Sequence, residues 1–94
     1  KIFSENSSQS DNKATIYIYQ GLSQIELNQF SNAEATFNSL INSNLIDSQK
    51  GYWYTALLYL KQERIDEVKE VLNIIISNSY YNHEKAQDLL NEIE

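Results

Sequence analysis

Reactive side chains are scarce in this chain, and the one residue that could begin a metal or acid–base site is His83. Gln87 and Asp88 follow at spacings that would place them near His83 on a helix. A metal site needs several convergent His, Cys or carboxylate ligands, whereas this chain has one histidine and no cysteine. We therefore expect His83 to be a surface residue at a helix N-terminus, with no metal and no cofactor.

Carboxylates gather in one short stretch, at Glu63, Asp66, Glu67 and Glu70. Negative charges near the start of a helix stabilise it through the helix dipole, which accounts for this group without chemistry. The chain also has no glycine-rich phosphate loop and no nucleophile motif. We therefore expect that the protein is not an enzyme.

The charge balance is acidic, because seven Lys and Arg residues face thirteen Asp and Glu residues and the net charge is −6. Such a surface repels nucleic-acid phosphates, so we expect no nucleic-acid partner. No apolar run, such as residues 74–76, approaches the ~20 residues of a membrane span, so we expect no membrane contact. The chain starts at Lys1 and has no methionine, so we expect a piece of a longer protein, and localisation stays open.

Apolar residues recur every three or four positions along most of the chain, which is the spacing of a helix face. The spacing and the capping residues predict five helices, near residues 13–28, 31–43, 48–61, 66–77 and 82–94. Asp11 or Asn12 is expected to cap the first helix, and Ser31 with Glu34 forms a predicted capping box for the second. Two β-branched runs, residues 16–19 and 74–76, leave strands as an alternative, which the surrounding helical spacing disfavours.

The chain repeats itself after 35 residues. This shift places Tyr17 on Tyr52, Tyr19 on Tyr54, Gly21 on Ala56, Leu22 on Leu57, Ala33 on Val68, Phe37 on Leu72 and Leu40 on Ile75. A period of this length is typical of helical repeats, whose units stack and build an extended surface rather than a closed pocket. The predicted fold is therefore all-α, an array of antiparallel helix pairs that the last helix caps.

The first copy resembles a tetratricopeptide repeat. The small residues, the helix-ending residue and the aromatics of that motif match Gly21, Asn28, Phe30, Ala33 and Phe37. The second copy, which is more degenerate, has Ala56, Glu63, Ile65, Val68 and Leu72 in those places. The period of 35, the lack of proline and the polar residues Gln20, Gln24 and Thr55 depart from the usual pattern. The resemblance implies a single domain over residues 1–94, with a lead-in or upstream remnant (1–12), two repeats (13–44 and 48–79) and a capping helix (82–94).

Proteins of this family hold a partner peptide or surface in the concave groove that the first helix of each repeat lines. Carried over by position, the resemblance implies a groove of Thr15, Ile18, Leu22, Glu26, Lys50, Trp53, Leu57 and Lys61. Trp53 is the strongest candidate, because tryptophan is enriched at binding hot spots. Two interpretations of Trp53 stay open, since apolar stripes at helical spacing more often belong to a core. Lys50 and Lys61 either meet an acidic partner or are solvated surface charges.

The function that this resemblance implies is a protein–protein interaction or scaffolding module. A structural segment that caps a longer array or mediates self-association, with no ligand of its own, is the alternative. Ile16, Tyr17 and Tyr19 would form an uncovered face if an upstream repeat with Ile2 and Phe3 has been removed. Such a face allows a homodimer through the N-terminal end.

Overall fold

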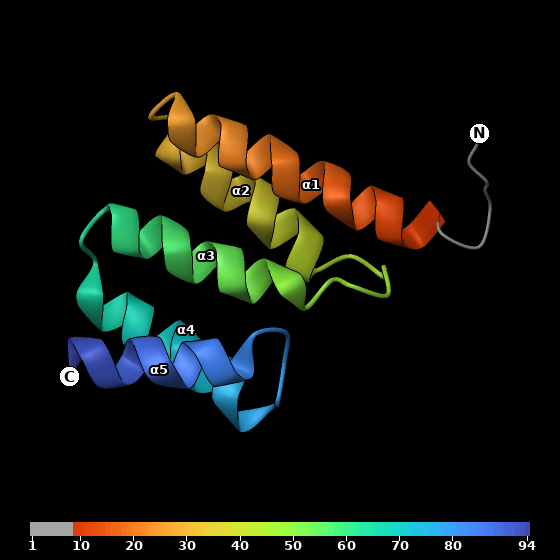
Figure 1. Ribbon diagram of the computed structural model, residues 1–94. Helices are drawn as coiled ribbons and strands as arrows, with labels where there is room; N and C mark the ends of the chain where they lie inside the picture. Colours follow the sequence, from red (N-terminus) through yellow and green to blue (C-terminus); the bar gives the residue numbers. More distant parts are fainter. Residues whose placement is uncertain (1–8) are drawn as a thin grey trace.

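The structure is a computed structural model that describes the backbone of residues 9–94 and the side chains from Lys13 onward. The described part contains α1 (Gln9–Glu26), α2 (Phe30–Ile41), α3 (Lys50–Lys61), α4 (Ile65–Ser77) and α5 (His83–Ile93), and no strand (Figure 1). The all-α prediction is therefore confirmed. The strand alternative is wrong, because residues 16–19 lie inside α1 and residues 74–76 inside α4.

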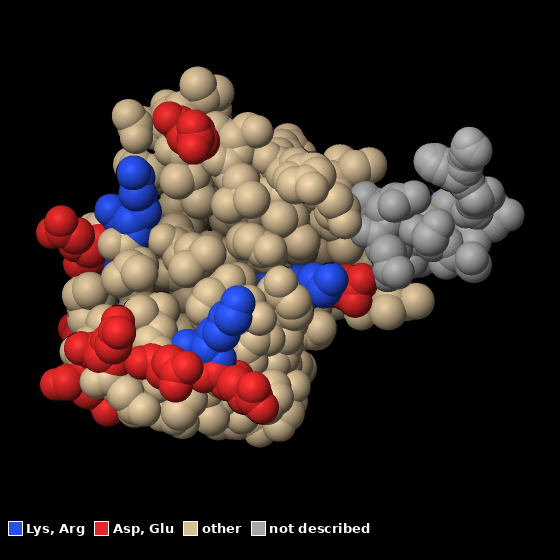
Figure 2. All heavy atoms as spheres, viewed as in Figure 1, with Lys and Arg blue, Asp and Glu red and all other residues tan. Residues whose placement is uncertain are grey.

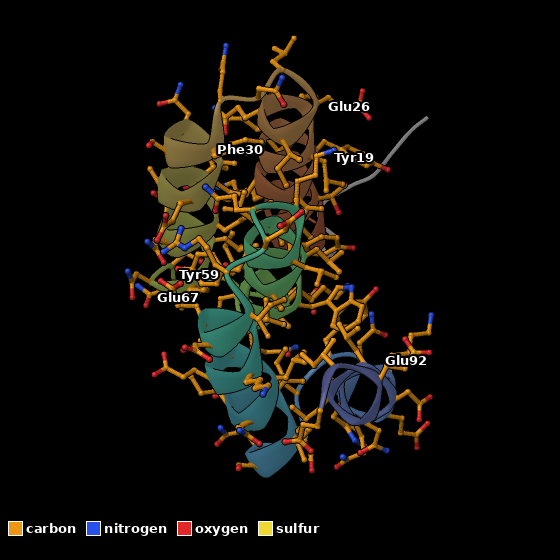
Figure 3. All side chains as sticks on the ribbon, turned by 90° about the vertical axis from the view of Figure 1, so that its left-hand side faces the viewer. Tyr19, Glu26, Phe30, Tyr59, Glu67 and Glu92 are labelled. Carbon is orange, nitrogen blue, oxygen red and sulfur yellow. The ribbon has the colours of Figure 1, made fainter. Side chains whose placement is uncertain are left out.

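Neighbouring helices run antiparallel, and each packs against the next one along the chain (Figure 1). α1 also contacts α3. In the view of Figure 3, α2 and α4 lie on one side of the molecule, whereas α1, α3 and α5 lie toward the other. The first and third helices are therefore neighbours although a whole helix separates them in sequence.

The contact between α1 and α2 is tight because Gly21 faces Phe37. A Cβ atom placed on Gly21 would overlap the Phe37 ring. Phe37 is fully buried and forms an apolar cluster with Ala33 and with Leu58 of α3. The lack of a side chain at Gly21 thus allows the close approach of α1 and α2, and α2 is held between α1 and α3.

The largest apolar cluster joins the last three helices. Its buried members are Ala56, Val68, Val71, Leu72, Ile75, Ala86 and Leu90. Ala56 comes from α3 and Ala86 and Leu90 from α5, so α4 is covered from two sides. Burial of this apolar surface, at about 25 cal/mol per Å², is what holds α5 on the preceding pair.

The two helix-to-helix turns after α1 and α3 have the same backbone geometry, 35 residues apart. Asn28 and Glu63 have positive φ angles of 61° and 60°. The amide of Asn28 donates to the Ile25 carbonyl oxygen and that of Glu63 to the Leu60 carbonyl oxygen, both at 2.9 Å. A left-handed residue is a common way to end a helix. Both turns therefore let the next helix fold back along the previous one.

The first helix begins at Gln9, four residues before the predicted start at Lys13. Asp11 and Asn12 therefore lie within α1, and the prediction that one of them caps it is wrong. The helix thus extends into the segment that the sequence assigned to the lead-in. Ile2 and Phe3, the expected remnants of an upstream repeat, lie outside the described residues.

The predicted capping box of the second helix is also wrong. α2 already begins at Phe30, so Ser31 lies in its first turn, and no side-chain hydrogen bond caps the helix at Gln29. Glu34 instead accepts a hydrogen bond from Tyr59, a residue 25 positions away. Similarly, α3 begins after Gln49 and α4 after Arg64, again without a side-chain cap, so Asp66 lies within α4.

The start of α5 at His83 agrees with the prediction. Ala86 and Leu90 are buried against α4, whereas Gln87 and Asn91 are exposed and share a hydrogen bond of 3.1 Å. α5 is therefore amphipathic, with one side packed on the helix stack and the other in water.

Candidate functional site

The eight predicted groove residues come from two helices and differ in how accessible they are. In α1, Thr15 and Glu26 are exposed, Leu22 is half-buried and Ile18 is buried. In α3, Lys61 is exposed, and Lys50, Trp53 and Leu57 are half-buried. Leu22, Glu26, Leu57 and Lys61 thus offer more surface to a partner than Ile18 does.

Ile18 and Trp53, at equivalent positions 35 residues apart, pack toward the helices that follow them. Ile18 is only 8% exposed and lies in an apolar cluster with Leu40, against which Tyr54 of α3 also packs. Trp53 packs against the cluster that includes Ala86 of α5. Each therefore has one side engaged within the protein.

Lys50 interacts with two residues of its own surroundings. Its Nζ atom is 3.7 Å from the Asp47 carboxylate and 5.0 Å from the centre of the Tyr81 ring. A partly exposed ion pair and a cation–π contact each contribute modestly, at most about 1 kcal/mol. The Lys50 ammonium group thus points toward the link before α5, and its charge is already engaged by groups of the same protein.

A hollow of about 490 Å³ lies on the surface of α1. Its lining residues are Tyr19, Leu22, Ser23, Glu26 and Leu27. Leu22 and Glu26 belong to the predicted groove, whereas Tyr19, Ser23 and Leu27 were not predicted as site residues. Figure 3 shows Tyr19 pointing away from α2 on the side of the molecule where α5 lies.

The sequence does contain a signal for these missed residues. No charged residue occurs between Lys13 and Glu26, although one side of this helix is exposed. Tyr19 is 67% and Leu27 66% exposed. A helix surface in water normally carries charges, so an uncharged exposed side is typical of a contact surface.

Charged side chains gather at the other end of the molecule. Figure 2 shows acidic residues along the edge over α5, and mostly uncharged surface over α1. The acidic residues of this last segment are Glu84, Asp88, Glu92 and Glu94. Among the residues that line the hollow on α1, Glu26 is the one with a charge.

A polar network on the opposite side joins α2 to the turn between α3 and α4. The Tyr59 hydroxyl donates a 2.8 Å hydrogen bond to Glu34, and the Arg64 guanidinium lies 4.3 Å from the Tyr59 ring centre. Arg64 also pairs with Glu34 at 3.6 Å and with Glu67. Figure 3 shows Tyr59 and Glu67 close together on this side. These contacts fix the second helix pair on the first, which is a structural role.

Burial shifts the pKa of two tyrosines. Desolvation by burial, helped by the bond to Glu34, raises the pKa of Tyr59 to about 12. Burial, followed by a hydrogen bond with Tyr81, raises the pKa of Tyr54 to about 12. The Tyr54 and Tyr81 rings are stacked with their centres 6.5 Å apart. Both phenols are therefore neutral at neutral pH and act in packing.

His83 lies with Asn82, Glu84 and Lys85 around a second hollow, of about 300 Å³, at the start of α5. Among the described residues, no group of three or more His, Cys, Asp or Glu side chains is placed to hold a metal ion. Within the same part of the chain, every helix is too short or too polar to cross a membrane.

Comparison with profiles of known protein families, with curated proteins and with solved structures gives no match to this chain. The tetratricopeptide resemblance therefore rests on the chain's own residues.

Proposed function

We propose that this chain is a protein–protein interaction or scaffolding module made of two tetratricopeptide-like helix pairs and a closing helix. The equivalent turns at Asn28 and Glu63 support the pairs, because both have the same φ angle and the same hydrogen bonds at a separation of 35 residues. The antiparallel packing of successive helices and the contact of α1 with α3 support stacking of the pairs. Such stacks act by surface contact.

The hollow on α1 is the observation that carries the proposed function. It combines the apolar side chains of Leu22, Leu27 and Tyr19 with the carboxylate of Glu26. Leu57 and Lys61 occupy the positions of α3 that are equivalent to Leu22 and Glu26 of α1. The partner segment that fits best inserts an apolar side chain and places a Lys or Arg near Glu26, because the net charge of −6 also favours a basic partner.

The alternative proposal is a structural segment that closes a helical array and has no ligand of its own. The polar outer side of α5, with its Gln87–Asn91 hydrogen bond, favours this alternative, since a closing helix needs a solvated face. The two proposals differ at Leu57 and Lys61: a binding module uses these residues, whereas a closing segment does not.

Selection of random peptides on the full chain, followed by amide chemical-shift mapping, tests the binding proposal. We expect peptides with apolar and basic residues that shift the amides around Leu22 and Leu57. Glu26→Lys should weaken them strongly, and Leu57→Ala should weaken them without unfolding the chain. Glu70→Lys is the matched control, because Glu70 is exposed on α4 and the substitution changes the net charge equally.

Two results would contradict the binding proposal. Peptides that map onto α4 or α5 instead would remove the α1 and α3 surface as the site. Equal loss of binding in Glu26→Lys and Glu70→Lys would show that only the overall charge matters, since a local contact depends on position.

A further inference from the structure

One side of α1, here called the α1 stripe, consists of Ile16, Tyr19, Gln20 and Ser23 and is exposed to solvent along its length. Ile16 is 62% and Tyr19 67% exposed. None of the four is charged, and the surrounding helix from Ala14 to Ile25 has no charged residue either. The stripe thus has the composition of a buried surface in an exposed place.

The same stripe recurs 35 residues later in α3, where it is covered. The equivalent residues there are Gly51, Tyr54, Thr55 and Leu58. Leu58 is fully buried against Ala33 and Phe37 of α2, and the Tyr54 ring centre lies 6.0 Å from that of Phe37. In α3, therefore, this stripe is the surface that packs on the second helix of the preceding pair.

A third occurrence, in α5, is covered in the same way. The equivalent residues are Ala86, Leu89, Leu90 and Ile93. Ala86 and Leu90 are buried in the cluster that contains Val68, Leu72 and Ile75 of α4. Two stripes of three thus lie on the second helix of a preceding pair, and the α1 stripe is the one left open among the described helices.

The opposite end of the stack is closed. The positions of α3 that meet α4, Tyr52 and Ala56, correspond to Gln87 and Asn91 in α5. Both are exposed and polar and are bonded to each other. A second copy of the chain could not stack end to end here. In the described part of a second copy, α2 and α4 are already covered by α3 and α5, so of its three stripes only that of α1 is open.

We propose that the α1 stripe is the docking surface for an antiparallel helix pair whose second helix lies along α1 as α2 lies along α3. The proposal rests on the proposed protein-binding function and names its partner class. It also fixes the partner's side chains. Ile16 replaces Gly51, whose Cβ would lie 2.6 Å from Ile41 Cγ1, so the partner has a small residue there. Ser23 replaces Leu58, so the partner has a large apolar residue opposite it.

Insertion of a second copy of residues 13–47 between Asn12 and Lys13 of the full chain tests this docking directly. The inserted copy has Ile41→Ala, to leave room for Ile16, and the 35-residue period is kept. We expect a higher midpoint of chemical denaturation and a several-fold slower nitration of the original Tyr19 by tetranitromethane. The same insert with native Ile41 should raise the denaturation midpoint by less.

Tyr19→Asp in the original copy is the matched control. In the parent chain it should change the midpoint little, because the side chain is exposed, whereas in the extended chain it should abolish the gain. An insert that leaves Tyr19 reactive and the midpoint unchanged, or that adds no helix, overturns the proposal. So does a dimer of the parent chain that protects Tyr19, because the occupant is then a second copy. If the peptide selection fails but the insert docks, the proposed peptide-binding groove is wrong, whereas the α1 stripe still stands as a docking surface.

Discussion

Phe37 occupies the space that a side chain at Gly21 would need. A Cβ atom on Gly21 would overlap the Phe37 ring, and the ring cannot move aside because it is fully buried between α1, α2 and α3. The pair therefore sets how closely the first two helices approach. It also gives the sharpest test of the fold.

Gly21→Ala should destabilise the protein although alanine is the better helix former. The propensity gain is about 1 kcal/mol, whereas overpacking of a rigid core site costs about 1–3 kcal/mol, and Gly21→Leu should cost more. Gly51→Ala tests the equivalent close contact between α2 and α3, since a Cβ there would lie 2.6 Å from Ile41 Cγ1 and 3.1 Å from the Phe37 carbonyl oxygen, and it should also destabilise the protein. Thermal unfolding of the three variants decides the matter, and a Gly21→Leu chain that melts like the parent would contradict this packing.

Phe37→Ala should cost about 3–5 kcal/mol, because it leaves a cavity at the contact of three helices. Leu40→Ala, in the neighbouring cluster, should cost about 2–5 kcal/mol. Ala35→Ser, on the exposed side of the same helix, should stay within about 0.5 kcal/mol. Urea denaturation gives the three values, and a loss for Phe37→Ala as small as that for Ala35→Ser would place the ring outside the core.

Tyr59→Phe should lower the free energy of unfolding by about 0.5–1.5 kcal/mol, because it removes the hydrogen bond to Glu34 and keeps the ring under Arg64. Ser31→Ala should be within about 0.5 kcal/mol, because Ser31 does not cap α2. A working capping box predicts the reverse order, with a loss near 1 kcal/mol for Ser31→Ala. Denaturation of both variants at neutral pH separates the two arrangements.

Stability should fall as the pH rises from about 10 to about 12. The folded-state pKa of Tyr54 and Tyr59 is about 12, above the ordinary value of 10.0, so folding favours the neutral phenols. Their contribution is fully present below about pH 10, and it is lost as the pH rises through the folded-state pKa. Ultraviolet titration of tyrosinate should show a late step that shrinks in Tyr54→Phe and in Tyr59→Phe. If the late step keeps its full size in a variant with both Tyr54→Phe and Tyr59→Phe, other tyrosines cause it.

Deletion of residues 83–94 should cause aggregation or a large loss of helicity, because it uncovers Val68, Leu72 and Ile75 of α4. Leu90→Asp should act in the same direction, since that side chain is only 6% exposed. Gln87→Asp is the control on the outer side of α5 and should be nearly neutral. Light scattering and circular dichroism measure both effects, and a soluble, fully helical truncated chain would show that α5 is a tail.

The helices themselves could be predicted from the sequence, because the spacing of apolar residues along a helix is a local property. The predicted positions of α2, α3, α4 and α5 agree with the structure within a few residues. The caps could not be predicted in this way. Ser31 and Glu34 have the spacing of a capping box, yet Glu34 is drawn away by Tyr59 and Arg64, which lie near it only once α3 packs on α2.

The sequence by itself determined the all-α fold and the 35-residue period, since both follow from which residues are apolar and how they are spaced. Only the tertiary structure decided which apolar residues stay in contact with water. Ile18 and Tyr19 are neighbours in one uncharged run, but the packing of α2 and α3 buries the first and leaves the second exposed. Accessibility depends on what covers a surface, and for the α1 stripe the covering helix is the partner that we propose.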